Sequence, residues 1–166
     1  QAADPGNLKG KTVIDATNAI APSGDLALGF STSGAEELAK LVPDAQVVKA
    51  FNTIFATNMS TGQIGGHTLT LPVAGDDPDA KATAMALASD IGFEPVDAGS
   101  LRMARYLEPM GMHMMVLAYR QKLGTGIGYQ LIRAGGTPDE AGRETPSART
   151  SGTLITRLGH FGVPRF

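Results

Sequence analysis

Residues 68–97 read TLTLPVAGDDPDAKATAMALASDIGFEPVD, and this stretch decides the predicted fold. Its first seven residues form a largely apolar run that is typical of a buried strand. Asp77 and Pro78 suit the cap and the first position of a helix, and Gly92 suits its end. Residues 93–97 (FEPVD) read as a second strand. A strand, a helix and a strand joined by short connections predict a parallel or mostly parallel sheet covered by helices.

Two details of this unit set further expectations. Pro72 has no N–H to give to a neighbouring strand, so the first strand is expected to lie at an edge or to be irregular there. The helix after Pro78 carries apolar residues at helical spacing, which predicts one buried face. Those residues are Ala80, Ala84, Leu87, Ala88 and Ile91.

The same alternation extends toward the N-terminus. Residues 12–17 (TVIDAT) and 46–51 (QVVKAF) read as two more strands. Between them, Ser33 followed three residues later by Glu36 predicts a helix start with a capping box, and Pro43 ends that helix. Ligands of such sheets bind beyond the carboxyl ends of the strands, so the residues that follow each strand are the first candidates for a site.

The chain after the last strand reads as helical. Ser100 suits the cap of a short helix, and Pro109 suits the start of a second helix that runs to about Leu123. Residues 110–119 of the second helix are apolar nearly all round, which predicts a central position for it. A short strand is predicted at residues 128–133.

Composition bounds the class of protein. The 166 residues are 42% hydrophobic and 18% charged, which is typical of a globular domain. The formal net charge of −2 argues against a binder of nucleic acid or of a membrane surface, because both need a basic excess. The sequence has no cysteine, which excludes thiolate chemistry, and no apolar run approaches the roughly 18 residues of a membrane span. A cytoplasmic location is the expectation.

Five segments occur in the order, and at about the spacing, seen in one group of oxidoreductases. They are Gly10–Asn18 (GKTVIDATN), Val48–Thr53 (VKAFNT), Val73–Asp77 (VAGDD), Gly92–Gly99 (GFEPVDAG) and Leu107–Pro109 (LEP). Each segment alone is a weak signal, whereas all five in order are a strong one. Over about residues 8–133 the chain therefore resembles the NADPH-dependent deazaflavin-coenzyme reductases, also called reduced-deazaflavin:NADP oxidoreductases.

The resemblance implies an α/β fold of truncated Rossmann type, with a mostly parallel sheet, flanking helices and a helical C-terminal region. Residues 1–133 would form the back half of the oxidoreductase domain. Residues 134–166 lie outside the resemblance, and our hypothesis for this extra tail is that it packs on a partner chain. The resemblance also implies two cofactors, NADP and a deazaflavin coenzyme, between which a hydride passes. Such catalysis is mainly the positioning of two cofactors, so no catalytic side chain is predicted.

The sequence departs from this family in two places. The glycine-rich fingerprint GxGxxG, which holds the pyrophosphate at a helix N-terminus, is missing from all 166 residues. Gly124, Gly126 and Gly128 have the wrong third spacing and follow a predicted helix, so they read as a helix stop with a flexible turn. In addition, Asn18 is followed by Ala19, where the family usually has Asn-Pro.

Six residues are the candidates for binding the cofactors. Asn18, Asn52 and Thr53 follow strands, and in the family interpretation they line the nicotinamide cleft, where side-chain amides bond the carboxamide or the ribose. The alternative is that each asparagine closes its own turn. Arg102 and Arg105 would meet phosphate or a carboxylate of the deazaflavin, although solvated surface arginines are the commoner case. The full set is Asn18, Asn52, Thr53, Gly75, Arg102 and Arg105.

Other polar and sulfur-containing residues favour structural roles. Asp15 and Asp97 lie in or near the ends of strands with no histidine nearby in sequence, and Glu108 reads as a charge at a helix start. The methionines at positions 110, 112, 114 and 115 surround His113. Thioethers suit soft metals such as copper, but methionine also fills irregular gaps, which favours core or dimer packing. No metal site is predicted.

Two classes of function remain from the sequence. In the first, the chain is a piece of an NADP-dependent oxidoreductase that transfers a hydride between NADP and a deazaflavin or related acceptor, with impaired activity in this short form. In the second, it is a non-catalytic homodimer that binds a small ligand or serves a structural role. A half-sheet exposes an apolar edge that must be covered, which favours the homodimer if the chain is the whole gene product.

Overall fold

A computed structural model gives the structure of residues 5–133. The chain divides into two units, residues 1–131 and 132–166, and the second unit lies almost entirely outside the described residues. The predicted packing of residues 134–166 on a partner chain therefore falls outside the described residues too. The first unit contains the elements η1 (Pro5–Leu8), β1 (Thr12–Asp15), α1 (Gly34–Leu41), β2 (Gln46–Lys49), η2 (Ala56–Asn58), β3 (Gln63–Ile64), β4 (His67–Thr68), β5 (Thr70–Gly75), α2 (Pro78–Ile91), β6 (Glu94–Gly99), η3 (Leu101–Met103), α3 (Ala104–Met115) and η4 (Val116–Arg120).

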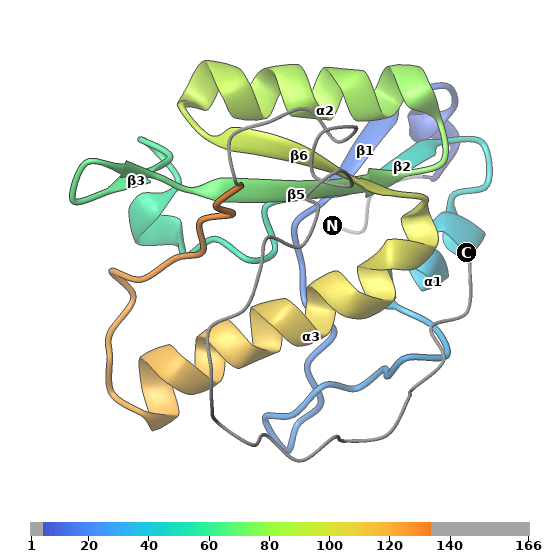
Figure 1. The fold of residues 1–166 in the computed structure, drawn as a ribbon. Helices are drawn as coiled ribbons and strands as arrows, with labels where there is room; N and C mark the ends of the chain where they lie inside the picture. Colours follow the sequence, from blue (N-terminus) through green and yellow to red (C-terminus); the bar gives the residue numbers. More distant parts are fainter. Residues whose placement is uncertain (1–4, 134–166) are drawn as a thin grey trace, which may run out of the picture. The chain divides into compact units, whose positions relative to one another are not determined.

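The main sheet has four strands in the order β1-β2-β5-β6 (Figure 1). β1 pairs with β2 and β5 pairs with β6 in parallel, whereas β2 and β5 run antiparallel. The sheet is thus mostly parallel, as predicted. The antiparallel pairing of β2 and β5 corrects the expectation that residues following all four strands lie together. It puts the carboxyl ends of β5 and β6 at the end of the sheet opposite to the carboxyl ends of β1 and β2.

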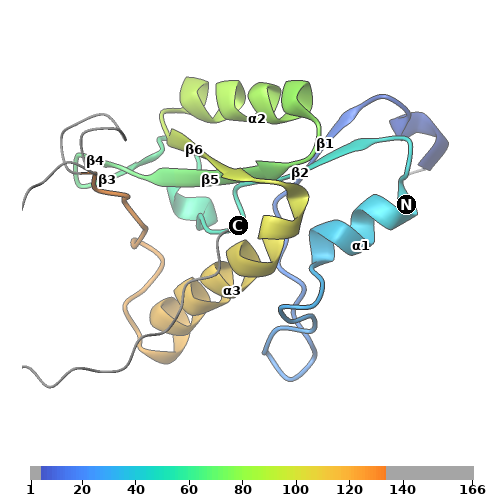
Figure 2. The same cartoon turned by 45° about the vertical axis from the view of Figure 1, so that its right-hand side comes forward.

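Helices cover both faces of this sheet (Figures 1 and 2). α2 lies on one face, and α1 and α3 lie on the other. Three alanines of α2, each at most 3% exposed, pack on the apolar side chains of β5, including Leu71 and Val73. Leu87 was expected on this buried face but is 44% exposed. The fold is α/β with helices on both faces, as the periodicity predicted.

The predicted helix starts are confirmed by their cap contacts. The Asp77 carboxylate accepts from the backbone N–H of Ala80 at 2.8 Å, with Pro78 in the first helical position. The Ser33 hydroxyl accepts from the N–H of Glu36 at 3.2 Å and donates to its carboxylate at 2.8 Å. In both helices a side-chain oxygen thus meets an N–H that has no partner within the helix.

Pro72 lies in the interior strand β5, but no residue of β2 is paired opposite it, so its missing N–H costs the sheet no hydrogen bond. The N–H of Thr70 points away from β6 and donates to the carbonyl of Tyr129 at 3.0 Å. Pro72, two residues later, faces the same side. There β2 has already ended, since β2 pairs only with Ala74 and Gly75 of β5. The edge position expected for this strand therefore applies only near Pro72, where β5 is unpaired on the side of β2.

The helical C-terminal region differs from its prediction. Instead of two helices, one helix α3 runs through Pro109 and continues as the π-helical turn η4. The Ser100 side chain forms no cap hydrogen bond, because the 3-10 turn η3 leads directly into α3. α3 lies on the surface rather than at the centre, since Met114 is 3% exposed but His113 is exposed to solvent.

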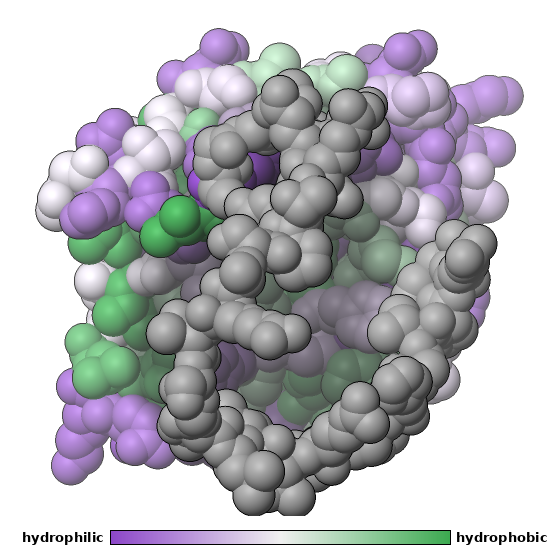
Figure 3. Space-filling model, in the orientation of Figure 1, coloured by the Kyte–Doolittle hydropathy of each residue, from purple (hydrophilic) through white to green (hydrophobic). Residues whose placement is uncertain are grey.

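The segment after η4 runs back along the sheet without forming the strand that was predicted at residues 128–133. The N–H of Gly124 bonds back to the carbonyl of Ala118 at 3.1 Å, so the predicted helix stop lies where the glycines begin. Where the described surface is visible in Figure 3, apolar residues gather near this segment. Its exposed side chains include Leu123 and Leu131, at 60% and 48% exposure.

Candidate functional site

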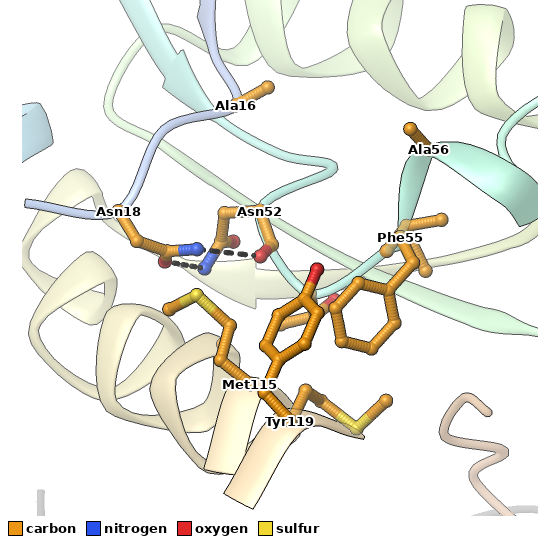
Figure 4. A pocket seen from close by; sticks show the side chains of 11 residues that line it. Ala16, Asn18, Asn52, Phe55, Ala56, Met115 and Tyr119 are labelled. Carbon is orange, nitrogen blue, oxygen red and sulfur yellow. Dashed lines mark hydrogen bonds between the residues drawn. The ribbon is translucent and has the colours of Figure 1, made fainter. Parts of the chain in front are cut away.

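A pocket of about 200 Å³ lies at the carboxyl ends of the parallel strands β1 and β2 (Figure 4). The segments after the two strands form one wall, and the C-terminal half of α3 with η4 forms the other. Three of the six predicted binding residues, Asn18, Asn52 and Thr53, line it. The complete lining is Ala16, Asn18, Asn52, Thr53, Ile54, Phe55, Ala56, Gly111, Met114, Met115 and Tyr119.

Asn18 and Asn52 are joined to each other across the pocket floor. The Nδ2 group of Asn18 donates to the backbone carbonyl of Asn52, and the Nδ2 group of Asn52 donates to Oδ1 of Asn18, both at 3.0 Å. The Asn52 Nδ2 group also donates to the carbonyl of Leu107 at 2.7 Å. A carbonyl only accepts, so this contact decides which end of the Asn52 amide faces α3.

The pair leaves one acceptor and one donor for a ligand. Among the described residues, no hydrogen bond reaches Oδ1 of Asn52. No buried side-chain nitrogen or oxygen of the described residues lacks a partner, so this oxygen is accessible from outside the protein. The Nδ2 group of Asn18 uses one hydrogen on the Asn52 carbonyl and keeps its second hydrogen. The alternative that each asparagine only closes its own turn does not describe these long-range contacts.

Gly111 allows α3 to approach the asparagine pair. A Cβ atom at this position would lie 2.6 Å from Oδ1 of Asn18 and 2.8 Å from the backbone oxygen of Asn52. Real Cβ atoms essentially never come within 3.0 Å of another atom, and the Asn52 oxygen belongs to the backbone and cannot rotate away. A side chain here would push α3 away from the strand ends, so glycine is required by the close contact.

Aromatic and sulfur-containing side chains form the outer part of the pocket. Phe55 and Tyr119 meet edge to face, with ring centroids 6.0 Å apart and planes at 87°. In Figure 4, Tyr119 rises from η4 between Asn52 and Phe55, and Met115 lies beside it. Tyr119 is 64% exposed. The predicted packing role of the methionines thus applies to Met114, which is buried, while Met115 forms pocket wall.

A buried group of charges lies directly behind the asparagine pair. The Nζ atom of Lys49, which has no exposed surface, donates to the carboxylates of Asp15 and Glu108 at 2.8 Å each and to the carbonyl of Thr17 at 2.6 Å. Burial alone would raise the pKa of Asp15. Hydrogen bonds from Lys49 and Thr17 outweigh that effect and hold the pKa below its ordinary value.

The prediction that Glu108 stands at the start of its own helix is wrong, and its carboxylate instead meets the start of α1. Glu108 lies inside α3, and its carboxylate accepts from the N–H groups of Gly34 and Ala35 at 3.0 and 3.2 Å. These N–H groups belong to the first turn of α1, where a negative charge is favourable. Glu108 therefore links α3, α1 and the lysine of β2.

The other three predicted binding residues lie away from the pocket. Gly75 is buried in the sheet opposite Val48, because β5 runs antiparallel to β2. Arg105 donates two hydrogen bonds, at 2.7 and 2.8 Å, to the carboxylate of Glu36, and these bonds lower the pKa of Glu36. Arg102 is exposed in η3. The structure therefore brings together the asparagines and Thr53 and leaves the glycine and both arginines outside.

Some functional residues that the sequence reasoning missed carry weak signals in the sequence. Lys49 follows two valines in a buried strand, and a lysine there needs a buried partner, which is a readable anomaly. Gly111 interrupts an otherwise side-chain-bearing helix. Tyr119 had no signal of its own, since only the π-helical turn and the fold place it opposite Phe55. Asp97 bonds to Lys81 at 2.9 Å, which fits the structural role that was predicted for it.

Neither a metal site nor a membrane-spanning helix occurs among the described residues. They contain no group of three or more histidine, aspartate or glutamate side chains arranged to hold a metal ion. Within the same part of the chain, every helix is too short or too polar to cross a membrane.

Comparisons with known proteins point to reductases. The chain is 38% identical over 108 residues to metalloreductase STEAP3 of Rattus norvegicus and 30% identical over 110 residues to metalloreductase STEAP2 of Homo sapiens. These matches cover 65% and 66% of this chain but 21% of each relative, so the chain spans about a fifth of the length of these proteins. No protein-family model matches the chain.

A solved structure to which the chain is similar is also described as a reductase. A protein of Arthrobacter sp. FB24 that was assigned as an F420-dependent NADP reductase superposes with a TM-score of 0.74 at 28% sequence identity. The match covers 80% of this chain and 62% of that one. The chain thus has a Rossmann-like α/β fold and is similar to part of proteins that are named as reductases.

Proposed function

We propose that this chain forms the nicotinamide side of an NADP-linked hydride-transfer site. The observation that carries the proposal is the Asn18–Asn52 pair, which presents a donor and an acceptor in a pocket at the carboxyl ends of two parallel strands. In sheets of this class, ligands bind at that position. The similarity to a protein assigned as an NADP reductase supports the same conclusion.

The chemistry of the pair fits a primary carboxamide such as that of nicotinamide. Oδ1 of Asn52 can accept from the carboxamide NH₂ group, and the second hydrogen of the Asn18 amide can be donated to its carbonyl oxygen. Thr53, 4% exposed, stands next to this pair on the pocket lining. These residues would hold and orient a nicotinamide ring, while the hydride itself is chemistry that the cofactor supplies.

The size of the pocket limits what it holds. Its volume of about 200 Å³ lies below the roughly 300–1,000 Å³ of pockets that enclose drug-sized ligands, so it suits one ring rather than a dinucleotide. The sequence contains no glycine-rich loop for the pyrophosphate. We infer that strong NADP binding requires phosphate contacts beyond those that the pocket lining provides.

The proposed hydride acceptor is a planar ring of the deazaflavin type. Phe55 and Tyr119 provide aromatic faces and edges at the outer side of the pocket, which suit a second ring near the first. Among the described residues that line the pocket, Tyr119 carries the only titratable group. A small carbonyl acceptor needs a proton donor at its oxygen, and the Tyr119 hydroxyl is the one titratable donor among these lining residues, whereas a ring acceptor delocalises the added electrons over its own ring system.

A titration of the ¹⁵N-labelled chain with NADPH tests the proposal by NMR. We expect weak binding, with a Kd on the order of 1 mM, and chemical shift changes at the side-chain amides of Asn18 and Asn52. Asn52→Ala should abolish the change at the Asn18 amide. Asn58→Ala is the matched control, because Asn58 is equally buried at 7% exposure but donates to Thr125 and Ile127 outside the pocket.

The same titration separates the two classes of function. Binding localised at the pocket supports the NADP-linked site. If saturating NADPH leaves the amides of Asn18 and Asn52 unchanged, or shifts the Asn18 amide as much in Asn52→Ala as in the native chain, the nicotinamide assignment is wrong and the non-catalytic interpretation gains support. Adding a deazaflavin or a simple aldehyde to the NADPH-loaded chain then compares acceptors, with loss of the reduced nicotinamide absorbance as the readout.

A further inference from the structure

Lys49 is the most completely satisfied charged side chain in the described part of the molecule. Its side chain has no exposed surface, and its three ammonium hydrogens have three acceptors: Asp15, Glu108 and the carbonyl of Thr17. The acceptors come from β1, from α3 and from the loop after β1. One side chain of β2 therefore ties together β1, the loop after β1 and α3, and the last two of these segments line the candidate site.

Stability alone is a poor reason for this arrangement. Taking charges out of water is costly, and well-packed apolar residues often stabilise a core as well as a buried ion pair does. Here two carboxylates share one lysine, and each carboxylate needs further donors. Asp15 takes them from Thr17, and Glu108 takes them from the first turn of α1. Fixed geometry is what such a network supplies.

The network and the asparagine pair act on the same short segments. Thr17, whose carbonyl Lys49 holds, directly precedes Asn18. Leu107, whose carbonyl accepts from Asn52, directly precedes Glu108. Moving α3 or the loop after β1 would therefore disturb both sets of contacts together. Gly111, one turn after Leu107, leaves no room for a looser fit.

We propose that Lys49 is a positioning residue, which through Asp15, Thr17 and Glu108 holds the Asn18–Asn52 pair in the geometry that presents its free donor and acceptor. The purpose assigned to this geometry rests on the proposed function. The positioning itself is a property of the chain without ligand.

The experiment measures solvent exchange of side-chain amide protons by NMR in the full chain without ligand. Both hydrogens of the Asn52 amide are hydrogen-bonded, so their exchange with water should be slow in the native chain. In Lys49→Met we expect it to be at least about tenfold faster, since exchange follows local opening. Asp15→Asn, which keeps the shape and an acceptor oxygen, should give a smaller increase and serves if Lys49→Met does not fold.

An internal control separates positioning from general loss of stability. The amide of Asn58 is equally buried and donates to Thr125 and Ile127, away from the network. We expect its exchange to change little in either variant. Leu71→Ala removes apolar packing from the other face of the sheet and should accelerate both amides alike if it accelerates either.

The outcome decides the proposal without reference to cofactor binding. Selective acceleration at Asn52 supports positioning by Lys49. If Lys49→Met and Asp15→Asn accelerate the exchange of the Asn52 amide no more than that of the Asn58 amide, Lys49 is a structural charge only and the proposal is wrong. A chain that fails to bind NADPH but shows selective acceleration would refute the nicotinamide assignment and leave the positioning role standing.

Discussion

Two regions of the molecule, the α2 face of the sheet and the carboxyl ends of β1 and β2, are held together by different interactions. On the α2 face, alanines at helical spacing pack on β5, so the contacts are apolar and non-directional. At the polar end of β1 and β2, formed by Asp15, Asn18, Lys49, Asn52 and Glu108, directional bonds join residues 34 to 74 positions apart. The α2 face therefore supplies stability, and the polar end supplies the geometry of a site.

Removing apolar volume from the α2 face should have the largest effect on stability. Leu71 is fully buried, and Leu71→Ala leaves a cavity beneath α2. We expect a loss of about 2–5 kcal/mol in the free energy of unfolding, measured by urea denaturation. Leu41→Ala is the control, because Leu41 is 72% exposed and should cost less than about 0.5 kcal/mol. Equal effects of the two variants would contradict the assignment of this face as the main core.

Gly111→Ala tests the closeness of α3 to the polar end. The added Cβ meets Asn18 and the Asn52 backbone, so we expect a loss of about 1–3 kcal/mol and separation of the amide pair. The measurements are urea denaturation and the NMR shifts of the side-chain amides. Gly126→Ala has no atom within 4 Å of its added Cβ and should leave both unchanged. Unchanged amide shifts in Gly111→Ala would show that α3 is farther from the strand ends than described.

The charges of the polar end should make stability depend on acid pH. The pKa of Asp15 in the folded chain is below its ordinary 3.8, so its contribution is complete above that pH and is lost as the pH falls through the folded pKa. In Asp15→Asn this contribution is absent. We expect the slope of unfolding free energy against pH below about pH 4 to become shallower by up to about 1.4 kcal/mol per pH unit. Leu71→Ala should lower the whole curve without changing that slope.

Removing the cap of α2 should have the smallest effect. Asp77→Ala takes away the acceptor for the N–H of Ala80, and we expect a loss of about 1 kcal/mol by urea denaturation. The asparagine amides of the polar end should keep their shifts, since α2 lies on the other face. Asp79→Ala, in the first turn but without the cap contact, is the control. Shifted asparagine amides in Asp77→Ala would show that the α2 face and the polar end are coupled.

Local sequence patterns predicted much of the fold. The caps at Ser33 and Asp77, the strand–helix alternation and the alanine stripe of α2 were all readable, because they depend on neighbours within about four residues. Helix α3 was misread as two helices because Pro109 looked like a start. Its continuity is decided by tertiary contacts, among them Glu108 bonded to the first turn of α1.

The candidate site was readable only in part. Asn18, Asn52 and Thr53 were found because each follows a strand and binding sites lie there in parallel sheets. Gly75 was selected by the same rule and lies elsewhere, because strand direction is not encoded in any one segment. Arg105 was selected for its charge, but Glu36 of α1 holds it.

The sequence by itself determined the strand–helix alternation up to β6, the caps at Ser33 and Asp77 and the alanine face of α2, since these follow from hydrophobic periodicity and local hydrogen bonding. Only the tertiary structure decided that Lys49 would be buried between two carboxylates, that Gly111 would touch the asparagine pair and that Tyr119 would face Phe55. The reason is that directional contacts between distant segments exist only once strand order, strand direction and helix position are set together.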